Sequence, residues 1–377
     1  MTKDLLHTEQ IKALVCDAYR AALNDPTRMA PRLYSDAELA RVPKISVERS
    51  YGVGNPLRYA DIRPGEAILD IGCGAGVDTI LAAQEVGPEG SVIGLDILPE
   101  MLAITESAVR EAGLENVTTV EGAMEAIPLP ADSVDLIVSN GVVNLSPRKA
   151  RALAEFARVL RAGGRVCLAD LVMEGQELPP EVLVHPAAWA GCVAGVLTID
   201  AFTEKLLRFG FEEVQIVHRR AFGIDDCSTY PLFTNDLIAL MKKFIPEERL
   251  DEIVTQIVIT GRLGSRDSMP SSAPSDHVPV AAHLFDAGDL GCASGLPREF
   301  RRRINEIPEG ERLTTVARDP SAKEDLPSLA RLLGHTVENV SADESGRVLI
   351  TVMRGPNPRS MNSDNAQVSR HDRDNVG

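Results

Sequence analysis

The sequence predicts an α/β protein, with a doubly wound parallel sheet followed by a smaller α/β domain of two layers. Short β-rich runs alternate with helical periods over residues 66–170, which is typical of a sheet with helices on both faces. The run 264–279 is rich in Ser, Pro, Gly and Asp and cannot pack a core. With 377 residues, 44% of them apolar, the chain has enough material for two cores.

The elements of the first domain follow from these periods in order. Strands are expected at AILDI, SVIGLD, NVTTVE, VDLIVSN and RVCLAD, and helices at VDTILAAQEV, PEMLAITESAVREAG and PRKARALAEFARVLRAGG. Gly113 and the pair Gly163 and Gly164 follow two of these helices and match helix C-cap chemistry. Further on, helices are expected at 199–209 and 235–244, and a strand at 214–218.

These elements predict the domain boundaries. The first domain covers residues 1–263 and begins with a helical extension, 1–44. A linker occupies 264–280, and the second domain covers 281–354. The tail 355–377 lacks apolar periodicity and is expected to be disordered.

Charge and cysteine usage limit the partners and the compartment. The chain carries 55 acidic and 39 basic side chains, a formal net charge of -16, so its field repels nucleic acid and anionic lipid. We expect no nucleic-acid partner, no membrane span and a cytoplasmic location, because no apolar run is long enough to span a bilayer or to form a signal peptide. The six cysteines lie far apart without CxxC spacing, which predicts separate thiols and no metal site.

A glycine loop is the first candidate site. The strand AILD leads into IGCGAGVD, with Gly72, Gly74 and Gly76 opening onto a helix, where glycines allow the backbone to approach a ligand closely. The spacing GxGxG differs from that of dinucleotide sites, where the third glycine comes three residues after the second. It resembles motif I of class I methyltransferases that depend on S-adenosylmethionine (SAM). In them the motif begins with an acidic residue, here Asp70, and holds the amino acid portion of SAM.

Asp96, at the end of SVIGLD, is the second candidate. Its carboxylate can accept both ribose hydroxyl protons. It can equally cap the helix that begins near Pro99, and the sequence leaves both interpretations open.

The stretch EGAMEAIPLPADSVDLIVSN resembles the methyltransferase segment from the adenine-contacting turn to the fourth strand. The resemblance implies that Gly122, Ala123 and Met124 flank the adenine and that Asn140 faces the methionine end. Met124 taken alone is more often a core residue. The same resemblance assigns Tyr51 and Ile97 to the cofactor site.

Over roughly residues 45–220 the chain is similar to arsenite methyltransferases, through RSYGVGNPLRYADIRPGEAILDIGCGAGVD, SNGVVNLSPRKARALAEFARVLRAGGRVCLADLV and WAGCVAGVLTIDAFTEKLLRFGFEEVQIV. In that family three cysteine thiolates hold trivalent arsenic, a soft centre that prefers sulfur. Here Val53 and Gly141 occupy two of these positions and only Cys192 keeps its thiol. Cys227 can stand in for one of them or be an ordinary buried thiol, as can Cys192 itself.

The resemblance therefore implies methyl transfer from SAM to a small-molecule acceptor, with a soft thiol or metalloid favoured and Cys192 as the candidate catalytic thiol. Positioning can supply much of the rate enhancement of such a transfer, so no acid or base is identified.

The second domain resembles small sulfurtransferases of the TusA type, most closely in ARDPSAKEDLPSLARLLGHTV. It is expected to form strand, helix, strand, helix and the strand GRVLITVM. Cys292 lies just before the first helix, where the helix N-terminus favours a thiolate. The family has CPxP there, whereas this chain has CASG, so an interaction module with an idle thiol is an alternative. The resemblance implies a sulfur donor or acceptor protein as a partner. A SAM-binding or sulfur-relay protein acting through Cys292 without methyl transfer is the alternative function.

Overall fold

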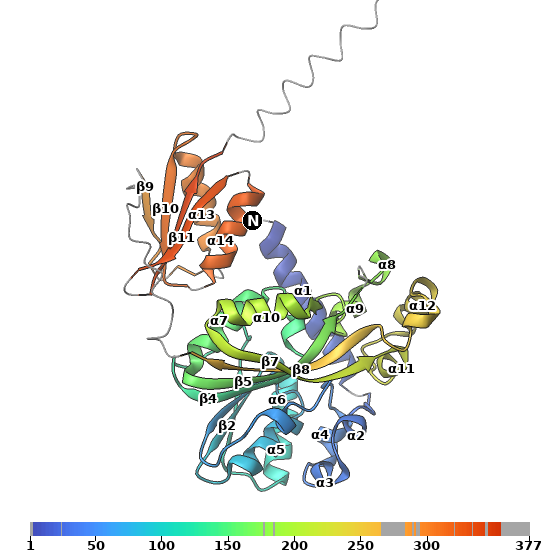
Figure 1. The fold of residues 1–377 in the computed structure, drawn as a ribbon. Helices are drawn as coiled ribbons and strands as arrows, with labels where there is room; N and C mark the ends of the chain where they lie inside the picture. Colours follow the sequence, from blue (N-terminus) through green and yellow to red (C-terminus); the bar gives the residue numbers. More distant parts are fainter. Residues whose placement is uncertain are drawn as a thin grey trace, which may run out of the picture. The chain divides into compact units, whose positions relative to one another are not determined.

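The computed structural model describes residues 3–23, 25–175, 178–183, 185–264, 283–288, 290–291, 295–319, 321–333, 335–343 and 346–355. The chain divides into two compact units, Met1–Ser271 and Ser272–Gly377 (Figure 1). Residues 265–280 of the predicted linker, Cys292 and residues 356–377 of the predicted tail lie outside the described residues.

The main sheet of the first unit is mixed. Its strand order is β3-β2-β1-β4-β5-β8-β7, and the short β6 (Leu197–Thr198) pairs with β5. The first five strands of the chain pair in parallel: β1 (Ala67–Ile71), β2 (Ser91–Asp96), β3 (Val117–Glu121), β4 (Val134–Asn140) and β5 (Leu160–Met173). The prediction of strand and helix alternation over this region is confirmed.

The prediction of a wholly parallel sheet is wrong at one edge. Strand β8 (Val254–Leu263), which the sequence analysis did not predict, pairs antiparallel with both β5 and β7 (Phe211–Phe222). The first six residues of β8 are all buried, so the strand lacks the alternation that marks a half-exposed strand. The predicted strand 214–218 is the central part of the longer β7.

Four predicted helices of this unit are confirmed, some with shorter ends: α5 (Val77–Val86), α6 (Pro99–Glu111), α10 (Ile199–Arg208) and α12 (Asn235–Phe244). Helix α7 (Lys149–Val159) ends earlier than predicted, because Leu160 is extended and begins β5. Gly163 and Gly164 therefore lie inside β5, at a register shift against β4, and are not a helix cap. Gly113, with φ of 67° directly after the end of α6, fulfils its predicted role.

The predicted helical extension begins with α1 (Lys3–Ala22) and continues through α2 (Ala30–Leu33), α3 (Asp36–Leu39) and α4 (Lys44–Glu48). The remaining elements are short: α8 (Pro180–Leu183), α9 (Pro186–Ala190), α11 (Ile224–Cys227), and the 3-10 helices η1 (Pro56–Tyr59), η2 (Val143–Leu145) and η3 (Glu247–Arg249). Several of them connect the strand ends at which the candidate site lies.

Alternating side chains of the strands build a core on each face of the sheet. Ile68 of β1 packs with α5 and α6 on one face, whereas the adjacent Leu69 packs with α7 and α10 on the other. Figure 1 shows these two helix pairs on opposite faces of the sheet. This arrangement follows from the two-residue period of a strand and fixes the strand ends on which a site can be built.

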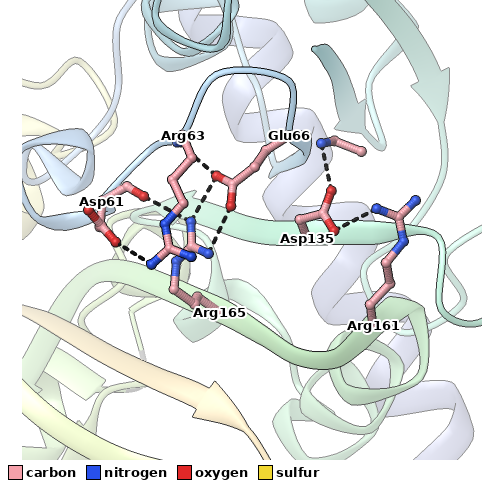
Figure 2. A network of polar contacts seen from close by, with 7 residues as sticks. Asp61, Arg63, Glu66, Asp135, Arg161 and Arg165 are labelled. Atoms are coloured by element: carbon pink, nitrogen blue, oxygen red, sulfur yellow. Dashed lines mark hydrogen bonds and ion pairs between the residues drawn. The ribbon is translucent and has the colours of Figure 1, made fainter. Parts of the chain in front are cut away.

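An ion-pair network joins the amino ends of β1, β4 and β5 (Figure 2). Arg165 of β5 donates to both carboxylate oxygens of Glu66, at 2.9 and 2.8 Å, and Arg161 pairs with Asp135. Asp135 also accepts the N–H of Ala67 at 2.9 Å. The network fastens the sheet at the edge opposite the glycine loop.

The second unit contains β9 (His283–Asp286), α13 (Leu296–Glu306), β10 (Arg312–Ala317), α14 (Ala322–Leu332), β11 (Thr336–Ala342) and β12 (Val348–Met353). Its sheet has the order β11-β12-β10-β9. Side chains of α13 and α14, such as Phe300 and Leu326, pack on Leu313 and Ile350 of the sheet. The predicted elements are present, and β11 is a strand that the sequence analysis did not predict.

Candidate functional site

A cavity opens at the carboxyl edge of β1, β2 and β4, where parallel α/β sheets bind their ligands. The space between its walls, open solvent at the mouth included, is about 1090 Å³. The strand-end residues that line it run over 70–75, 95–98, 122–125 and 140–142. Helix α1 and the loop 50–52 form the other wall.

The glycine loop forms the floor of this cavity. Gly72 and Gly74 both have positive φ, 70° and 52°, which side chains adopt only at a cost. A Cβ added to Gly74 would meet no other atom closer than 3.9 Å and would occupy cavity space, whereas one at Gly72 would lie 2.5 Å from Val142. The loop is thus a cradle that admits a ligand against bare backbone, and its residues fit SAM.

Gly76 is the N-cap of α5, with φ of 87°. An added Cβ at this position would lie 3.0 Å from Thr105, and Gly76 is not among the lining residues of the cavity. A side chain at this position would point at α6 and not into the cavity. The glycine is therefore required by the turn into α5 and not by a ligand.

Asp96 stands at the end of β2 and connects two backbone segments. One carboxylate oxygen accepts the N–H of Gly74 at 2.9 Å and the other accepts the N–H of Leu98 at 2.9 Å. Burial raises its pKa, while these N–H groups oppose the rise. The side chain lines the cavity beside Ile97, so the carboxylate holds the glycine loop and the start of α6 while facing the ligand space.

Asn140, at the end of β4, anchors the loop that carries Val53. Its Oδ1 accepts the N–H groups of Val53 and Gly54 at 2.8 and 2.9 Å. Its Nδ2 donates to Asp78 at 2.9 Å and lies 3.0 Å from the hydroxyl of Tyr34. One amide therefore ties the loop 52–54 to the cavity edge.

Buried carboxylates gather at this edge. Asp70, Asp78, Asp96 and Asp170 all have pKa values raised by burial, that of Asp170 to about 6. Asp70 accepts the Thr79 hydroxyl at 2.6 Å, and Asp78 accepts the Tyr34 hydroxyl at 2.8 Å. These carboxylates are held by hydrogen bonds from the backbone, hydroxyls and amides, which makes the edge polar without an array of cations.

Helix α1 covers the cavity and is fastened by ion pairs at its middle and in its last turn. Lys12 pairs with Glu125 at 3.1 Å and Arg20 pairs with Glu100 at 2.9 Å. Tyr19 of α1 meets Tyr51 edge to face, with ring centroids 5.4 Å apart. Four residues of α1 line the cavity: Lys12, Val15, Cys16 and Tyr19.

The three positions that the sequence analysis compared with arsenic-binding cysteines come together beside Asn140. A Cβ added to Gly141 would lie 3.2 Å from Val53 Cγ1. The Cys192 thiol donates to the carbonyl oxygen of Gly141 at 3.0 Å. Cys192 is 3% exposed and has φ of 60°, and burial raises its pKa. Gly141 lines the cavity, and Cys192 lies behind it.

Ten residues that the sequence analysis assigned to the cofactor site line the cavity: Tyr51, Asp70, Gly72, Gly74, Asp96, Ile97, Gly122, Ala123, Met124 and Asn140. The sequence analysis missed Asp78, for which an acidic residue in the first helical turn after the glycine loop was an available signal. It also missed Lys12 and Tyr19, for which the sequence offers no local signal, because only the folded chain brings α1 to the cavity.

The described cysteines are all free thiols: Cys16, Cys73, Cys167, Cys192 and Cys227. Within the described ranges, His, Cys, Asp and Glu do not gather in a group of three or more that could hold a metal ion. None of the described helices combines the length and apolar character needed to cross a bilayer.

Comparison with known proteins relates this part of the chain to methyltransferases. Residues 62–213 match the family model of a methyltransferase domain. The arsenite methyltransferase of Halobacterium salinarum is 42% identical over 185 residues, which make up 49% of this chain and 47% of that protein. The aklanonic acid methyltransferase DauC of a Streptomyces species is 38% identical over 120 residues, covering 31% of this chain and 54% of that protein.

Among solved structures, an arsenic(III) S-adenosylmethionine methyltransferase from Chlamydomonas reinhardtii is similar, with 30% identity and a TM-score of 0.48. That similarity covers 70% of this chain and 75% of the other. The chain spans about half the length of the curated relatives it matches.

The fold, the glycine loop and the match to the family model together identify the class of this domain. Residues 62–213 form a SAM-dependent methyltransferase domain, and SAM is its cofactor. Within that class, the domain is similar in sequence to arsenite methyltransferases.

Proposed function

We propose that the chain transfers the methyl group of SAM to a soft small-molecule acceptor, a thiol or a metalloid, at the Gly141 end of the cavity, with Cys192, directly behind Gly141, as the candidate thiol for binding it. The observation that carries this proposal is the meeting of Val53, Gly141 and Cys192 next to Asn140. Sulfur is the preferred donor for soft centres, and one thiol is present where the arsenite methyltransferase pattern has three.

The chain's own residues bind and orient in this proposal. Gly72 and Gly74 would hold the amino acid portion of the cofactor, Asp96 its ribose, and residues 122–124 its adenine. Bound SAM supplies an electrophilic methyl on a sulfonium. A thiol or selenol acceptor would lose its proton to solvent, and its lone pair would bond to that carbon as the carbon–sulfur bond of SAM breaks, which would leave S-adenosylhomocysteine. Tyr51 and Asn140 would contact the cofactor, with Asn140 at its methionine end, so that its methyl group would be in line with an acceptor beside Gly141.

Turnover is the test of methyl transfer. We expect the wild-type chain to form S-adenosylhomocysteine with small thiols or selenols and to methylate arsenite poorly, because one thiolate replaces three. SAM binding without turnover for any of these acceptors would contradict the proposal, and robust methylation of arsenite would contradict its acceptor class.

The acceptor class can be tested by restoring thiols. The double variant Val53→Cys/Gly141→Cys should raise the yield of methylated arsenic, despite the strain of a side chain at Gly141, whose φ is 74°. The double variant Val53→Ala/Gly141→Ala makes the same backbone demand without thiols and is the matched control. Equal yields from the two double variants would contradict the assignment of these positions.

For the second unit we propose a TusA-like module in which Cys292 carries sulfur to or from a partner protein. The support is the order of its strands and helices and the start of α13 at Leu296, four residues after Cys292.

Limited alkylation followed by peptide mapping should label Cys292 faster than Cys16, whose pKa is raised by burial. Equal rates would leave the module without a reactive thiol. A sulfur relay without methyl transfer would be contradicted by SAM turnover.

A further inference from the structure

Lys149, the first residue of α7, carries a partly buried cation near the acceptor end of the cavity. Its Nζ donates to the carbonyl oxygens of Ser146 at 2.9 Å and Asn144 at 3.1 Å. It also lies over the ring of Trp189, 5.9 Å from the centroid. Burial lowers its pKa to about 8, which Asp170 opposes. The amino group is thus held by two carbonyl oxygens and an aromatic face, all of which stabilise its charged form.

The ring of Trp189 belongs to the turn that carries Cys192. The N–H of Cys192 donates to the carbonyl oxygen of Trp189 at 3.1 Å, and the Cys192 thiol donates to Gly141. At the end of this turn, a Cβ added to Gly195 would lie 3.1 Å from Lys149 Nζ and 2.3 Å from the Asn144 carbonyl oxygen. The turn 189–195 therefore packs directly against the lysine and its carbonyl partners.

The backbone conformation of Cys192 needs support from such contacts. A φ of 60° is uncommon for a residue with a side chain and costs on the order of 1 kcal/mol. Surrounding contacts must hold such a conformation. On the far side of Lys149, the amide of Asn144 donates to Asp170 at 2.8 Å and to the carbonyl oxygen of Leu171 at 2.6 Å. A continuous chain of contacts thus runs from β5 through Asn144 and Lys149 to the turn.

We propose that Lys149 is a positioning residue for the methyl acceptor: it fixes the turn 189–195 and so holds the Cys192 thiol against Gly141. This inference rests on the proposed function for its catalytic meaning. Its structural content, the fixing of the Cys192 turn by a cation, can be measured without any turnover.

Trp189 is the one tryptophan of the chain, so its fluorescence reports on this turn alone. In Lys149→Met, which keeps the length of the side chain but removes the cation, we expect a changed Trp189 emission. The rate at which iodoacetamide alkylates Cys192 should rise about tenfold, because the turn opens more often. Lys149→Arg should restore both signals toward the wild-type values.

Kinetics separate positioning from a general loss of fold. The KM for the acceptor should rise about tenfold in Lys149→Met, with SAM affinity within about twofold of the wild type. Lys243→Met is the matched control, since Lys243 also lies over an aromatic ring, that of Phe244 at 4.9 Å, but on α12. It should leave Trp189 emission and Cys192 labelling unchanged.

Gly195→Ala provides a second route if Lys149→Met fails to fold, because its Cβ pushes the turn away from Asn144. It should give the same pair of signals. Unchanged Trp189 emission and Cys192 labelling in the folded variants would overturn the inference and leave Lys149 as a cap of η2. If the wild type transfers no methyl group, the proposed function fails, whereas the labelling result still decides the role of Lys149.

Discussion

The two edges of the main sheet carry different carboxylates and use them in opposite ways. At the amino edge, Glu66 and Asp135 pair with the guanidinium groups of Arg165 and Arg161 (Figure 2). At the carboxyl edge, Asp70 and Asp96 accept hydrogen bonds from hydroxyl and backbone N–H groups. Charges at the first edge are neutralised by the chain itself, whereas those at the second remain available to a ligand.

The difference appears in the protonation equilibria. The guanidinium of Arg63 lowers the pKa of Asp61 at the amino edge. Burial raises the pKa of every one of the four carboxyls described at the carboxyl edge. Perturbed carboxyls in a cavity are typical of functional sites, whereas paired ones are typical of structural networks. The sheet is therefore fastened by ion pairs at its amino edge and keeps buried carboxyls with raised pKa values at its carboxyl edge.

The largest effect is expected from Glu66→Ala at the amino edge. It leaves Arg165, 15% exposed, without its bidentate partner, and breaking a buried pair costs about 3 kcal/mol of unfolding free energy or more. Urea denaturation measures this loss, and calorimetric titration should find SAM affinity unchanged. Arg63→Ala removes an exposed pair of the same network and should change stability little. A loss of SAM affinity in folded Glu66→Ala would contradict the claim that the amino edge stabilises the sheet without contributing to cofactor binding.

The next effect concerns the pH dependence of stability. Asp170 has a folded pKa of about 6, above its ordinary value of 3.8, so the folded chain binds its proton more tightly than the unfolded chain. Its contribution to stability is fully present below pH 3.8 and is lost as the pH rises through 6. The shift corresponds to about 3 kcal/mol at most.

Asp170→Asn should therefore flatten the fall in unfolding free energy between pH 4 and 6, measured by urea denaturation at each pH. Asp61→Asn is the control at the other edge, because a lowered pKa gives a dependence of opposite sign. An unchanged slope in Asp170→Asn would show that Asp170 titrates alike in the folded and unfolded chains.

Local sequence predicted the glycine cradle well, because its conformation is encoded where it lies. The run IGCGAGVD contains the glycines whose positive φ the loop needs, directly between β1 and α5. The same holds for Asp96, whose place at the end of β2 puts it beside Gly74.

Long-range packing explains what the sequence did not predict. Strand β8 pairs with both β5 and β7 and is buried on both faces. Residues 160–164 belong to β5, where Leu160 pairs with Val134 before the register of β5 shifts against β4. Lys12 reaches Glu125 and Lys149 reaches Trp189 only in the folded chain. Contacts between residues so distant in sequence leave no local pattern.

The smallest expected effect, and the sharpest test of the comparison, is at Asp96. Asp96→Ala removes the proposed ribose contact, worth about 1.5 to 3 kcal/mol when charge-assisted, so SAM affinity should fall about 10- to 100-fold. It also removes the acceptors of the Gly74 and Leu98 N–H groups, which costs about 1 kcal/mol of unfolding free energy. Asp96→Asn retains an acceptor oxygen and should recover more stability than affinity.

Asp135 is the matched residue at the amino edge, because its carboxylate also accepts a backbone N–H, that of Ala67. Asp135→Asn should lower the unfolding free energy and leave SAM affinity at the wild-type value. Calorimetric titration of the two Asn variants against SAM, with urea denaturation of each, separates the roles of two carboxylates that make similar backbone contacts. Wild-type affinity in folded Asp96→Ala would mean that Asp96 only connects the glycine loop to α6, and the carboxyl edge would then hold its cofactor without a ribose carboxylate.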